Sequence, residues 1–479
     1  MQPSLYFYDL ETSGINPKTS RIMQFAGQRT DLDLQPIGAA DNLLLKITND
    51  ILPEPEAILI TGITPQQTLA EGISEAEFLK YFYEHIALPG TIFVGFNNIR
   101  FDDEFIRYLN YRNFYDAYQW HWQDGKSRWD LLDVSRMTRA LRPDGIKWPF
   151  APNGKASNRL ELLASVNKLT HDKAHDALSD VEATIAVTQL IKQQQPKLFN
   201  YLLSMRDKKN VESLVTKPAP FVYTSGRYSS EGDKTTVAVT IADHPTQKGA
   251  VLVYDLQTNP AKYVKMSQDK LAEKMAKFVT DENEERFPVK VLQFNHSPAV
   301  APLSVLDEPS QKRLKIDLNK INDHLKTLLS HSDFAENLRE AFIKKEKLRQ
   351  SSFVIDVSDV DSQLYDGFFG PADQDKMRLV RLAGQEDLAD LQPEFNDARL
   401  EKLLLLYKAR QYPLSLNEQE QKQWESYRQQ KLIDPKKGLL NSYFAKLDEL
   451  SQRKSVSDKQ RYLLEELKLY GESLLPYSS

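Results

Sequence analysis

Residues 6–14 have the sequence Tyr-Phe-Tyr-Asp-Leu-Glu-Thr-Ser-Gly, around which the N-terminal region is organised. The apolar and aromatic residues at 5–8 predict a buried strand, and Asp9 and Glu11, two positions apart, then project from one face of its end. Without a counter-charge one of the two carboxylates would be driven toward protonation, so the pair favours a hard divalent cation between them. The alternative is a solvated strand-to-turn junction whose acids merely precede Gly14.

The length of 479 residues is too great for one hydrophobic core and indicates about two to four domains. With 41% hydrophobic and 27% charged residues, the composition is that of an ordinary soluble globular protein. The sequence has no run of about 18 apolar residues, and its N-terminus enters a strand without a basic segment followed by an apolar one. We therefore expect a cytoplasmic protein with no membrane segment.

The absence of cysteine limits the chemistry that the chain can perform. Disulfides, thiolate zinc sites and cysteine nucleophiles are excluded, which leaves carboxylates and histidines as the available metal ligands. The net charge of −5 does not favour a nucleic-acid partner. It is an average over the chain, however, and a groove can be locally basic while the outer faces are acidic.

Residues 1–196 are predicted to form one α/β domain. Three strands precede any long helix, as in a sheet that begins with an antiparallel meander. A capping box at residues 74–77 then starts a helix, and a continuously apolar strand follows it. That strand ends in an acidic turn at residues 97–104, on the edge where α/β sheets bind ligands. The predicted strands are 5–10, 22–29, 42–47 and 91–96.

Aromatic residues and arginines alternate densely in the middle of this domain. Core packing has no use for so many arginines, so the stretch resembles a surface for single-stranded nucleic acid, where stacking contributes about 1–3 kcal/mol per base. In the alternative, half of the aromatics are core, as we expect for Tyr108, Tyr111 and Trp129. Tyr118 and Trp122 lie in a polar, irregular stretch and are expected to be exposed. The candidates for substrate contacts are Arg107, Tyr118, Trp122, Arg128 and Arg136.

The end of the domain supplies a histidine and an acid five positions apart, His175 and Asp180. At that spacing they cannot share a face of one regular helix. We expect His175 on the loop before the final helix, and Asp180 on the second turn of that helix, pointing inward. A lone histidine is usually structural, but here it would join a set with Asp9, Glu11 and Asp102.

This set of five residues resembles a known family. The signatures Asp-x-Glu-Thr, Asn-x-x-Phe-Asp and His-x-x-x-x-Asp, in this order, are similar to those of the DEDD exonucleases with the histidine variant. Each signature alone is weak, but together they are specific. Longer runs resemble the bacterial exonuclease I family, and they cover nearly the whole chain: Leu-Ile-Thr-Gly-Ile-Thr-Pro at 59–65, Tyr-Arg-Asn-Phe-Tyr-Asp at 111–116, Ser-Arg-Trp-Asp-Leu-Leu-Asp-Val at 127–134, Leu-Arg-Pro-Asp-Gly-Ile at 141–146, Ser-Gln-Leu-Tyr-Asp-Gly-Phe-Phe at 362–369, Arg-Leu-Glu-Lys-Leu-Leu at 399–404 and Tyr-Lys-Ala-Arg at 407–410.

The resemblance implies a ribonuclease H-like mixed sheet in residues 1–196 and a Src-homology-like barrel in residues 197–351. The spacing of apolar residues from 400 to 407 and the charged segment 418–430 indicate a helical domain over 352–479. The middle region has its own β-rich pattern. It predicts strands at 221–224, 236–241, 250–255 and 289–294 and helical stretches near 268–279 and 310–330.

The chemistry of phosphodiester cleavage suits these residues. It needs an in-line nucleophile, a stabilised leaving oxygen and neutralised phosphate charge, which two Mg²⁺ ions about 4 Å apart provide. Asp9, Glu11, Asp102 and Asp180 suffice to hold them, and Mn²⁺ is a candidate substitute. His175, with an ordinary pKa of about 6.5, is suited to take a proton from the attacking water.

The neighbouring acids are assigned other roles. We choose Asp102 as the ligand because it follows Phe101 directly, as the ligand of the family follows its aromatic residue. Asp103 is then left to cap or solvate the start of the helix. Asp172 and Asp176 are interpreted as solvated groups or local hydrogen-bond acceptors.

The family further implies a processive, single-strand-specific 3′→5′ exodeoxyribonuclease that releases 5′-mononucleotides and acts in DNA repair and recombination. Arg159 and the backbone around Glu11 would contact the departing nucleotide. The family also implies docking of the acidic tail of single-stranded DNA-binding protein, for which Arg142 and Tyr201 are candidates. We expect a monomer. The alternatives are an RNA-directed or proofreading exonuclease of the same superfamily, or a non-catalytic single-strand-binding protein.

Overall fold

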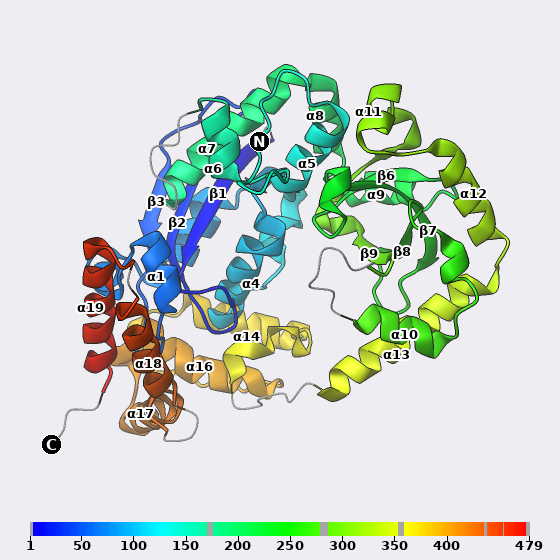
Figure 1. Cartoon of the computed structure of the whole chain (residues 1–479). Coiled ribbons are helices and arrows are strands. Elements are labelled where there is room, and N and C mark those ends of the chain that lie inside the picture. Colours follow the sequence, from blue (N-terminus) through cyan, green and yellow to red (C-terminus); the bar gives the residue numbers. More distant parts are fainter. Residues whose placement is uncertain are drawn as a thin grey trace.

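The computed structural model describes residues 3–169, 176–277, 286–352, 359–434, 438–453 and 455–475. We call residues 3–194 the N-terminal part, residues 196–352 the middle part and residues 360–475 the C-terminal part. Figure 1 shows the middle part beside the N-terminal part and the C-terminal part below it. These names are descriptive, and the domain boundaries after 196 and 351 stay predictions.

The N-terminal part is built on a five-stranded mixed sheet. Its strands are β1 (Ser4–Thr12), β2 (Ile22–Thr30), β3 (Asp41–Leu44), β4 (Thr91–Gly95) and β5 (Ser127–Asp130), in the order β3-β2-β1-β4-β5. β1 pairs antiparallel with β2 and parallel with β4, so the central strand carries both pairing types. The four predicted strands are confirmed, and β3 is shorter than expected. The antiparallel start of the sheet is also confirmed.

The helices of the N-terminal part are α1 (Pro55–Thr61), α2 (Pro65–Glu71), α3 (Glu75–Tyr81), α4 (Asp102–Arg112), α5 (Leu131–Leu141), α6 (Leu160–Val166) and α7 (Ala177–Gln194). The predicted capping box starts α3: the Glu77 N–H donates to Ser74 Oγ at 3.2 Å, and the Ser74 N–H donates to Glu77 Oε2 at 2.8 Å. The chain continues from α3 into a π-helix, η1 (Phe82–Ile86), which keeps Phe82 and Ile86 buried.

Alternation along β1 divides its side chains between two apolar clusters. Leu5 and Phe7 pack in a cluster with residues of α5 and α7. Tyr6 and Tyr8 pack on the other face, among the aromatic residues of α3, η1 and α4. Helices therefore cover both faces of the first sheet, and the end of β1 is held between them.

The middle part begins with α8 (Pro196–Ser204) and α9 (Lys208–Val215) and contains a five-stranded antiparallel sheet in the order β10-β6-β7-β8-β9. The predicted strands are confirmed, but the sequence pattern missed β10. The predicted helix at 310–330 is two helices. The remaining elements are β6 (Phe221–Thr224), β7 (Thr235–Asp243), β8 (Ala250–Asp255), α10 (Gln268–Ala276), β9 (Val289–Gln293), β10 (Ala299–Pro302), α11 (Glu308–Arg313), α12 (Leu318–Leu329) and α13 (Asp333–Ser352).

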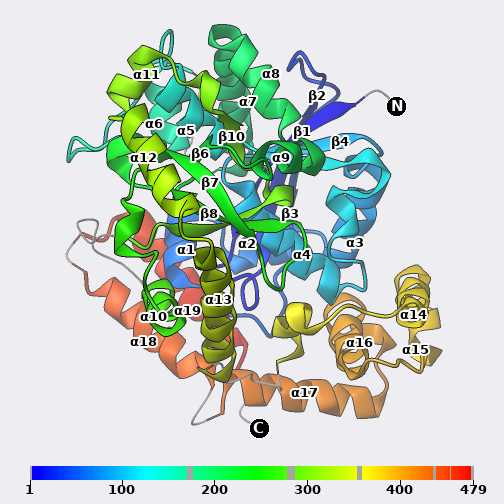
Figure 2. The same cartoon turned by 90° about the vertical axis from the view of Figure 1, so that its right-hand side faces the viewer.

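The C-terminal part is helical within its described residues, as predicted. It starts with the short 3-10 helix η9 (Val360–Asp366). Figure 2 shows α16 and α17 below α4 of the N-terminal part. Its longer helices are α14 (Pro371–Leu382), α15 (Gln385–Asp390), α16 (Ala398–Gln411), α17 (Glu418–Leu432), α18 (Leu439–Ser451) and α19 (Asp458–Ser473).

Apolar clusters join the three parts. One cluster runs from the first sheet through α8 into the second sheet. Another packs Met23 and Ile58 of the N-terminal part against Leu440 of α18 and Leu467 of α19. Because these contacts are buried, the parts support each other. No helix among the described residues has the length and apolar character needed to cross a bilayer.

Candidate active site

Three carboxylates meet where β1 ends beside the start of α7. Asp9, Glu11 and Asp180 each offer an oxygen, and these oxygens lie within 4.8 Å of one another. Asp180 lies in the first turn of α7, one turn earlier than predicted, because Asp176 caps the helix by accepting a hydrogen bond from the Ser179 N–H at 3.1 Å. The interpretation of Asp176 as a local acceptor agrees with this contact.

Asp102, the fourth predicted ligand, is outside this group of three but lies close enough to affect it. It is the first residue of α4 and is almost completely buried, and its Oδ1 has no hydrogen-bond partner among the described residues. Burial raises the pKa of Asp9 well above its ordinary value, and the charges of Asp102, Asp180 and Glu11 raise it further. Asp102 therefore shares the electrostatic field of the cluster.

The cluster has the electrostatics of a cation site. Burial first, and then the charges of Asp180 and Asp176, raise the pKa of Glu11 to about 8. The pKa of Asp102 is raised in the same sense by burial and by Asp103. Carboxylates with raised pKa values and an unpartnered buried oxygen are in an environment that a divalent cation would neutralise. The residues therefore fit an oxygen-ligated metal ion.

A cavity of about 570 Å³ opens beside these carboxylates. Asp9 and Asp180 form part of its wall, and the cationic residues Arg159, Arg136 and Lys234 form another part. The Arg159 side chain is 69% exposed and pairs with Glu161 at 2.6 Å. Lys234 comes from the middle part and was missed by the sequence analysis. The site is therefore completed by two parts of the chain.

Three family profiles match successive segments of the chain: "Exonuclease" over residues 6–188, "Exonuclease I SH3-like domain" over 206–344 and "Exonuclease I C-terminal domain" over 358–474. Exodeoxyribonuclease I of Haemophilus influenzae is 39% identical over 98% of this chain and 99% of its own length. The chain belongs to the exonuclease I family.

Solved members of the exonuclease I family share the fold. The zinc-bound complex of Escherichia coli exonuclease I with single-stranded DNA is 37% identical, with a TM-score of 0.92 over 99% of this chain and 100% of that one. A structure of SSB and exonuclease I with an inhibitor is 36% identical, with a TM-score of 0.89 and the same coverage. The chain is thus a metal-dependent exodeoxyribonuclease, and its ribonuclease H-like, SH3-like and helical architecture is confirmed.

His175, the predicted general base of this exonuclease, lies outside the described residues, as does Asp172.

Asp103 lies within the described residues, and the prediction that it caps α4 or faces solvent is wrong. It is completely buried, accepts a hydrogen bond from the Tyr8 hydroxyl and pairs with Arg128. Its side chain points into the protein, toward Tyr8 of β1 and Arg128 of β5, so it neither caps α4 nor meets solvent.

The arginine-rich stretch is less exposed than a nucleic-acid surface requires. Arg128 is buried in its ion pair with Asp103, and Arg107 is buried in an ion pair with Glu104. The sequence contains more arginines here than a hydrophobic core would need, and their ion pairs with acidic residues of the same chain explain them. Tyr108, Tyr111 and Trp129 are buried, as expected.

The two aromatics that were expected to be exposed differ. Trp122 is 58% exposed. Tyr118 is half-buried, with its ring 5.8 Å from that of Phe368 and with the Arg107 guanidinium 5.4 Å from its centre. Phe368 is itself 86% exposed, so the C-terminal part adds an exposed aromatic ring beside Tyr118.

The candidate partner residues lie where the N-terminal and middle parts meet. Arg142 follows α5 directly, donates to the Val305 carbonyl at 2.9 Å and pairs with Asp307 at 3.2 Å. Tyr201 lies in α8 and is half-buried against two apolar clusters. Both residues therefore have partners within this chain.

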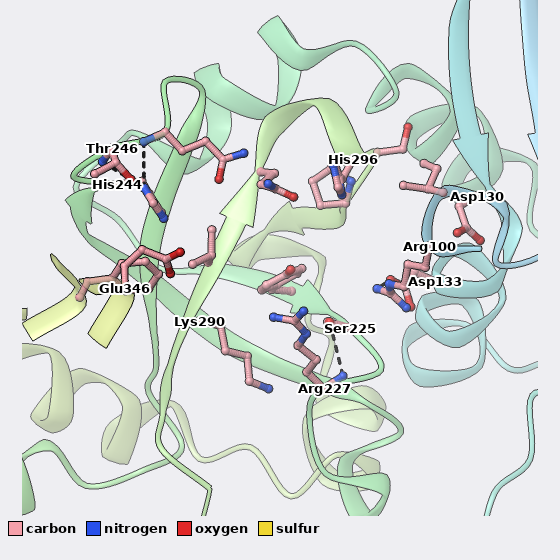
Figure 3. A pocket seen from close by; sticks show the side chains of 18 residues that line it. Arg100, Asp130, Asp133, Ser225, Arg227, His244, Thr246, Lys290, His296 and Glu346 are labelled. Atoms are coloured by element: carbon pink, nitrogen blue, oxygen red, sulfur yellow. Dashed lines mark hydrogen bonds and ion pairs between the residues drawn. The ribbon is translucent and has the colours of Figure 1, made fainter. Parts of the chain in front are cut away.

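A second cavity, of about 510 Å³, separates the middle part from the end of β5. Figure 3 shows Arg227, His244 and Lys290 on its middle-part wall, and Arg100 with Asp133 on the opposite wall. Burial lowers the pKa of Lys290 to about 7, since the attraction of Asp255 does not offset it. Charged residues thus line the cavity on both sides, and it lies next to the end of β5 and the start of α5.

Proposed function

We propose that the chain is a Mg²⁺-dependent exonuclease that digests single-stranded DNA from its 3′ end and releases 5′-mononucleotides. The observation that carries this proposal is the partly buried carboxylate cluster of Asp9, Glu11 and Asp180, with Asp102 in its field, at the wall of an open cavity. The DNA and SSB complexes of solved relatives support single-stranded DNA as substrate and SSB as partner.

The carboxylates of Asp9, Glu11, Asp102 and Asp180 would hold two Mg²⁺ ions, with Mn²⁺ as a substitute. Bound there, the ions supply charge neutralisation for the scissile phosphate and an activated water. His175 would act as the general base that accepts a proton from the attacking water, a role that suits a histidine near neutral pH.

The cationic residues of the cavity position the strand. Arg159 would hold the phosphate of the departing nucleotide by paired N–H donors, and its exposed side chain at the cavity wall supports this role. Arg136 and Lys234 line the same cavity from opposite parts of the chain and contribute positive charge along the backbone of the strand. Trp122, which is 58% exposed, and the half-buried Tyr118 offer aromatic rings for stacking of bases.

The partner site is proposed at the junction of the N-terminal and middle parts. Pro143, the residue after Arg142, lines a cavity of about 1120 Å³. The cavity wall contains cationic and aromatic residues, among them Arg139, Arg313 and Trp148, and also the acids Glu231, Asp233 and Asp255. Such a surface suits an acidic peptide with an apolar end. We further propose that the enzyme acts in the cytoplasm, as a monomer, in DNA repair and recombination.

The first prediction tests the carboxylate cluster. Asp180→Asn should reduce turnover on labelled single-stranded DNA by at least about a thousandfold, because one ligand of the cluster loses its charge. Binding of the strand should stay within about twofold, since the stacking surface lies elsewhere. Cleavage is measured with and without Mg²⁺ on matched DNA and RNA oligonucleotides.

The control for this test is Asp458→Asn, which removes the charge of a fully exposed carboxylate on α19. More than a few per cent of wild-type turnover in Asp180→Asn would contradict the proposal. A preference for RNA would favour an RNA-directed exonuclease, and strand binding by the wild type without cleavage would favour a binding protein.

A further inference from the structure

Two of the metal-binding carboxylates have sequence neighbours that touch each other. Tyr8 precedes Asp9 on β1, and Asp103 follows Asp102 on α4. The Tyr8 hydroxyl donates a hydrogen bond to Asp103 Oδ1, although 95 residues separate the two. Asn98 adds a donor to the same hydroxyl, at 3.3 Å. The backbone positions of two ligand-bearing elements are thus tied together one residue away from the ligands.

Arg128 extends this contact toward the middle part. Its guanidinium pairs with Asp103 Oδ2, so both oxygens of Asp103 are engaged. Its other terminal nitrogen donates to the Asn295 carbonyl at 2.9 Å, and the Ser297 hydroxyl donates to the Arg128 carbonyl at 2.7 Å. Arg128 lies on β5, the last strand in the order of the first sheet. A turn of the middle part therefore holds this strand by both its side chain and its backbone.

The turn that provides these contacts has an unusual backbone. The 3-10 helix η7 (Phe294–His296) ends at Ser297, which has φ 42° and ψ 51°, in the left-handed region. For a residue with a Cβ this conformation costs about 1 kcal/mol or more. Such strain persists where contacts with the surrounding structure hold the backbone in place. His296, in the same turn, lines the cavity of Figure 3 together with Asp130, the end of β5.

The ion pair of Asp103 and Arg128 carries two buried charges, so its loss should disturb the surrounding structure. Asp103 and Arg128 are 0% and 5% exposed, so loss of either partner leaves an uncompensated charge inside the protein. Contacts behind a metal ligand orient the ligand, and their loss typically reduces metal affinity or activity about 10–100-fold. A displacement of about 1 Å at a reacting centre has a comparable effect on rate.

We propose that Asp103 and Arg128 are positioning residues through which the docked middle part sets the spacing between Asp9 and Asp102. The inference rests on the proposed function, in which Asp9 and Asp102 are metal ligands. The middle part thereby acts on catalysis without touching the reacting phosphate. Movement of the turn at residues 294–297 is transmitted to Asp103 through Arg128, and to β1 through Tyr8.

The test compares the full-length variants Arg128→Met, Arg128→Lys and Ser297→Ala. We expect Arg128→Met to lower kcat about 10–100-fold, with KM for a single-stranded oligonucleotide within about twofold. It should also raise severalfold the Mg²⁺ requirement, measured as the Mg²⁺ dissociation constant by calorimetric titration of the protein without DNA. Arg128→Lys should restore part of kcat, because it keeps the charge. Ser297→Ala should change kcat and the Mg²⁺ requirement in the same direction by a smaller factor.

The matched control is Arg206→Met. Arg206 donates to the side chain of Ser127 at 3.2 Å, on the same strand and one residue from Arg128, and its terminal nitrogen donates to the Leu203 carbonyl at 2.7 Å. It should leave kcat and the Mg²⁺ requirement unchanged. The inference is overturned if Arg128→Met and Ser297→Ala keep wild-type values, or if their effect is confined to KM, as for a DNA contact.

Two further arms keep the outcome decisive. If Arg128→Met does not fold, as judged by its circular dichroism, Ser297→Ala decides by the same kinetic measurements. Asp180→Asn is assayed in parallel. If Asp180→Asn stays active, the proposed metal site has failed; if it is inactive while the Arg128 and Ser297 variants behave as wild type, only the positioning role has failed.

Discussion

At the scale of single residues, the cavity beside the carboxylates draws cations from two parts of the chain. Arg136 and Arg159 belong to the N-terminal part, whereas Lys234 reaches the same cavity from the middle part. A cation in this cavity should bind the DNA strand regardless of base sequence, because it contacts the negatively charged phosphates and not the bases.

The second prediction therefore concerns Lys234. Lys234→Ala should raise KM for single-stranded DNA about three- to tenfold at low salt with a smaller change in kcat, and it should reduce the slope of log binding constant against log salt by about 0.7. Lys326→Ala, which removes a 79% exposed cation of α12, is the control. Equal salt slopes for the wild type and Lys234→Ala would contradict a phosphate contact.

The sequence predicted the acidic residues of the site better than the residues around them. The two-residue repeat of a β-strand is enough to put Asp9 and Glu11 on one face. Asp180 was predicted on the correct helix, but it lies one turn earlier than expected. Arg128 was assigned to a DNA surface because an arginine among aromatics looks the same in a stacking platform and in a buried ion pair. Its partner, Asp103, lies 25 residues away, and only the fold brings them together. No local pattern marks Lys234.

At the scale of elements, the N-terminal cap of α7 fixes the position of an active-site carboxylate. The Asp176 carboxylate accepts from the Ser179 N–H, which fixes the first turn and with it Asp180. Side-chain caps of this kind contribute about 1 kcal/mol.

The third prediction follows from this cap. Asp176→Ala should lower the free energy of unfolding by about 1 kcal/mol in urea titrations, because one N–H at the start of α7 loses its acceptor. Asp176→Asn keeps an acceptor of equal quality and is the matched control. Equal destabilisation by both substitutions would show that the charge of Asp176, and not the cap, is what stabilises the protein.

Element prediction succeeded where the side-chain pattern repeats and failed where the backbone breaks it. The capping box before α3 and the strands of both sheets follow from local sequence. The predicted helix at 310–330 is interrupted because Lys315 adopts φ 55° and Asp317 caps a new helix by accepting from the Asn319 N–H at 2.9 Å. Apolar spacing continues through that break, so periodicity alone could not detect it. β10 is only four residues long and has no alternation to reveal it.

At the scale of the whole molecule, buried ion pairs join the N-terminal and C-terminal parts. Arg410 of α16 pairs with Asp50 and with Asp361, each at 2.7 Å. Arg21 also pairs with Asp361, at 2.8 Å, and Lys431 pairs with Asp50 at 2.9 Å. Burial by itself raises the pKa of both carboxyls, but the surrounding cations outweigh it and hold each pKa below its ordinary value.

The fourth prediction is the pH dependence of stability. Because the folded pKa of Asp361 is depressed, its contribution is fully present above the unfolded value of about 3.9 and is lost as pH falls toward the folded pKa. The wild-type Tm should therefore fall steeply below about pH 4. Asp361→Asn should lower the free energy of unfolding by about 3–5 kcal/mol at pH 7, by leaving cations unpaired, and should flatten the Tm decline in acid.

The measurement is calorimetry of the wild type and Asp361→Asn between about pH 7 and pH 2.5. Asp458→Asn again serves as the control, since its carboxyl is exposed and its loss should not alter the shape of the curve. Parallel declines of Tm in the wild type and Asp361→Asn would exclude Asp361 as a source of the acid sensitivity.

The packing of α18 and α19 against α1 and α2 also means that the N-terminal part is completed only late in synthesis. Gln66 donates to the Glu466 carbonyl at 2.6 Å across 400 residues of chain, and Met23 and Ile58 are covered by the same helices. A ribosome adding about 5–20 residues per second needs roughly 20–80 s to make that stretch. During that time the nascent N-terminal part carries uncovered apolar surface and is a natural client for chaperones. The carboxylate cluster, which spans residues 9 to 180, is therefore synthesised well before the helices that cover this apolar surface.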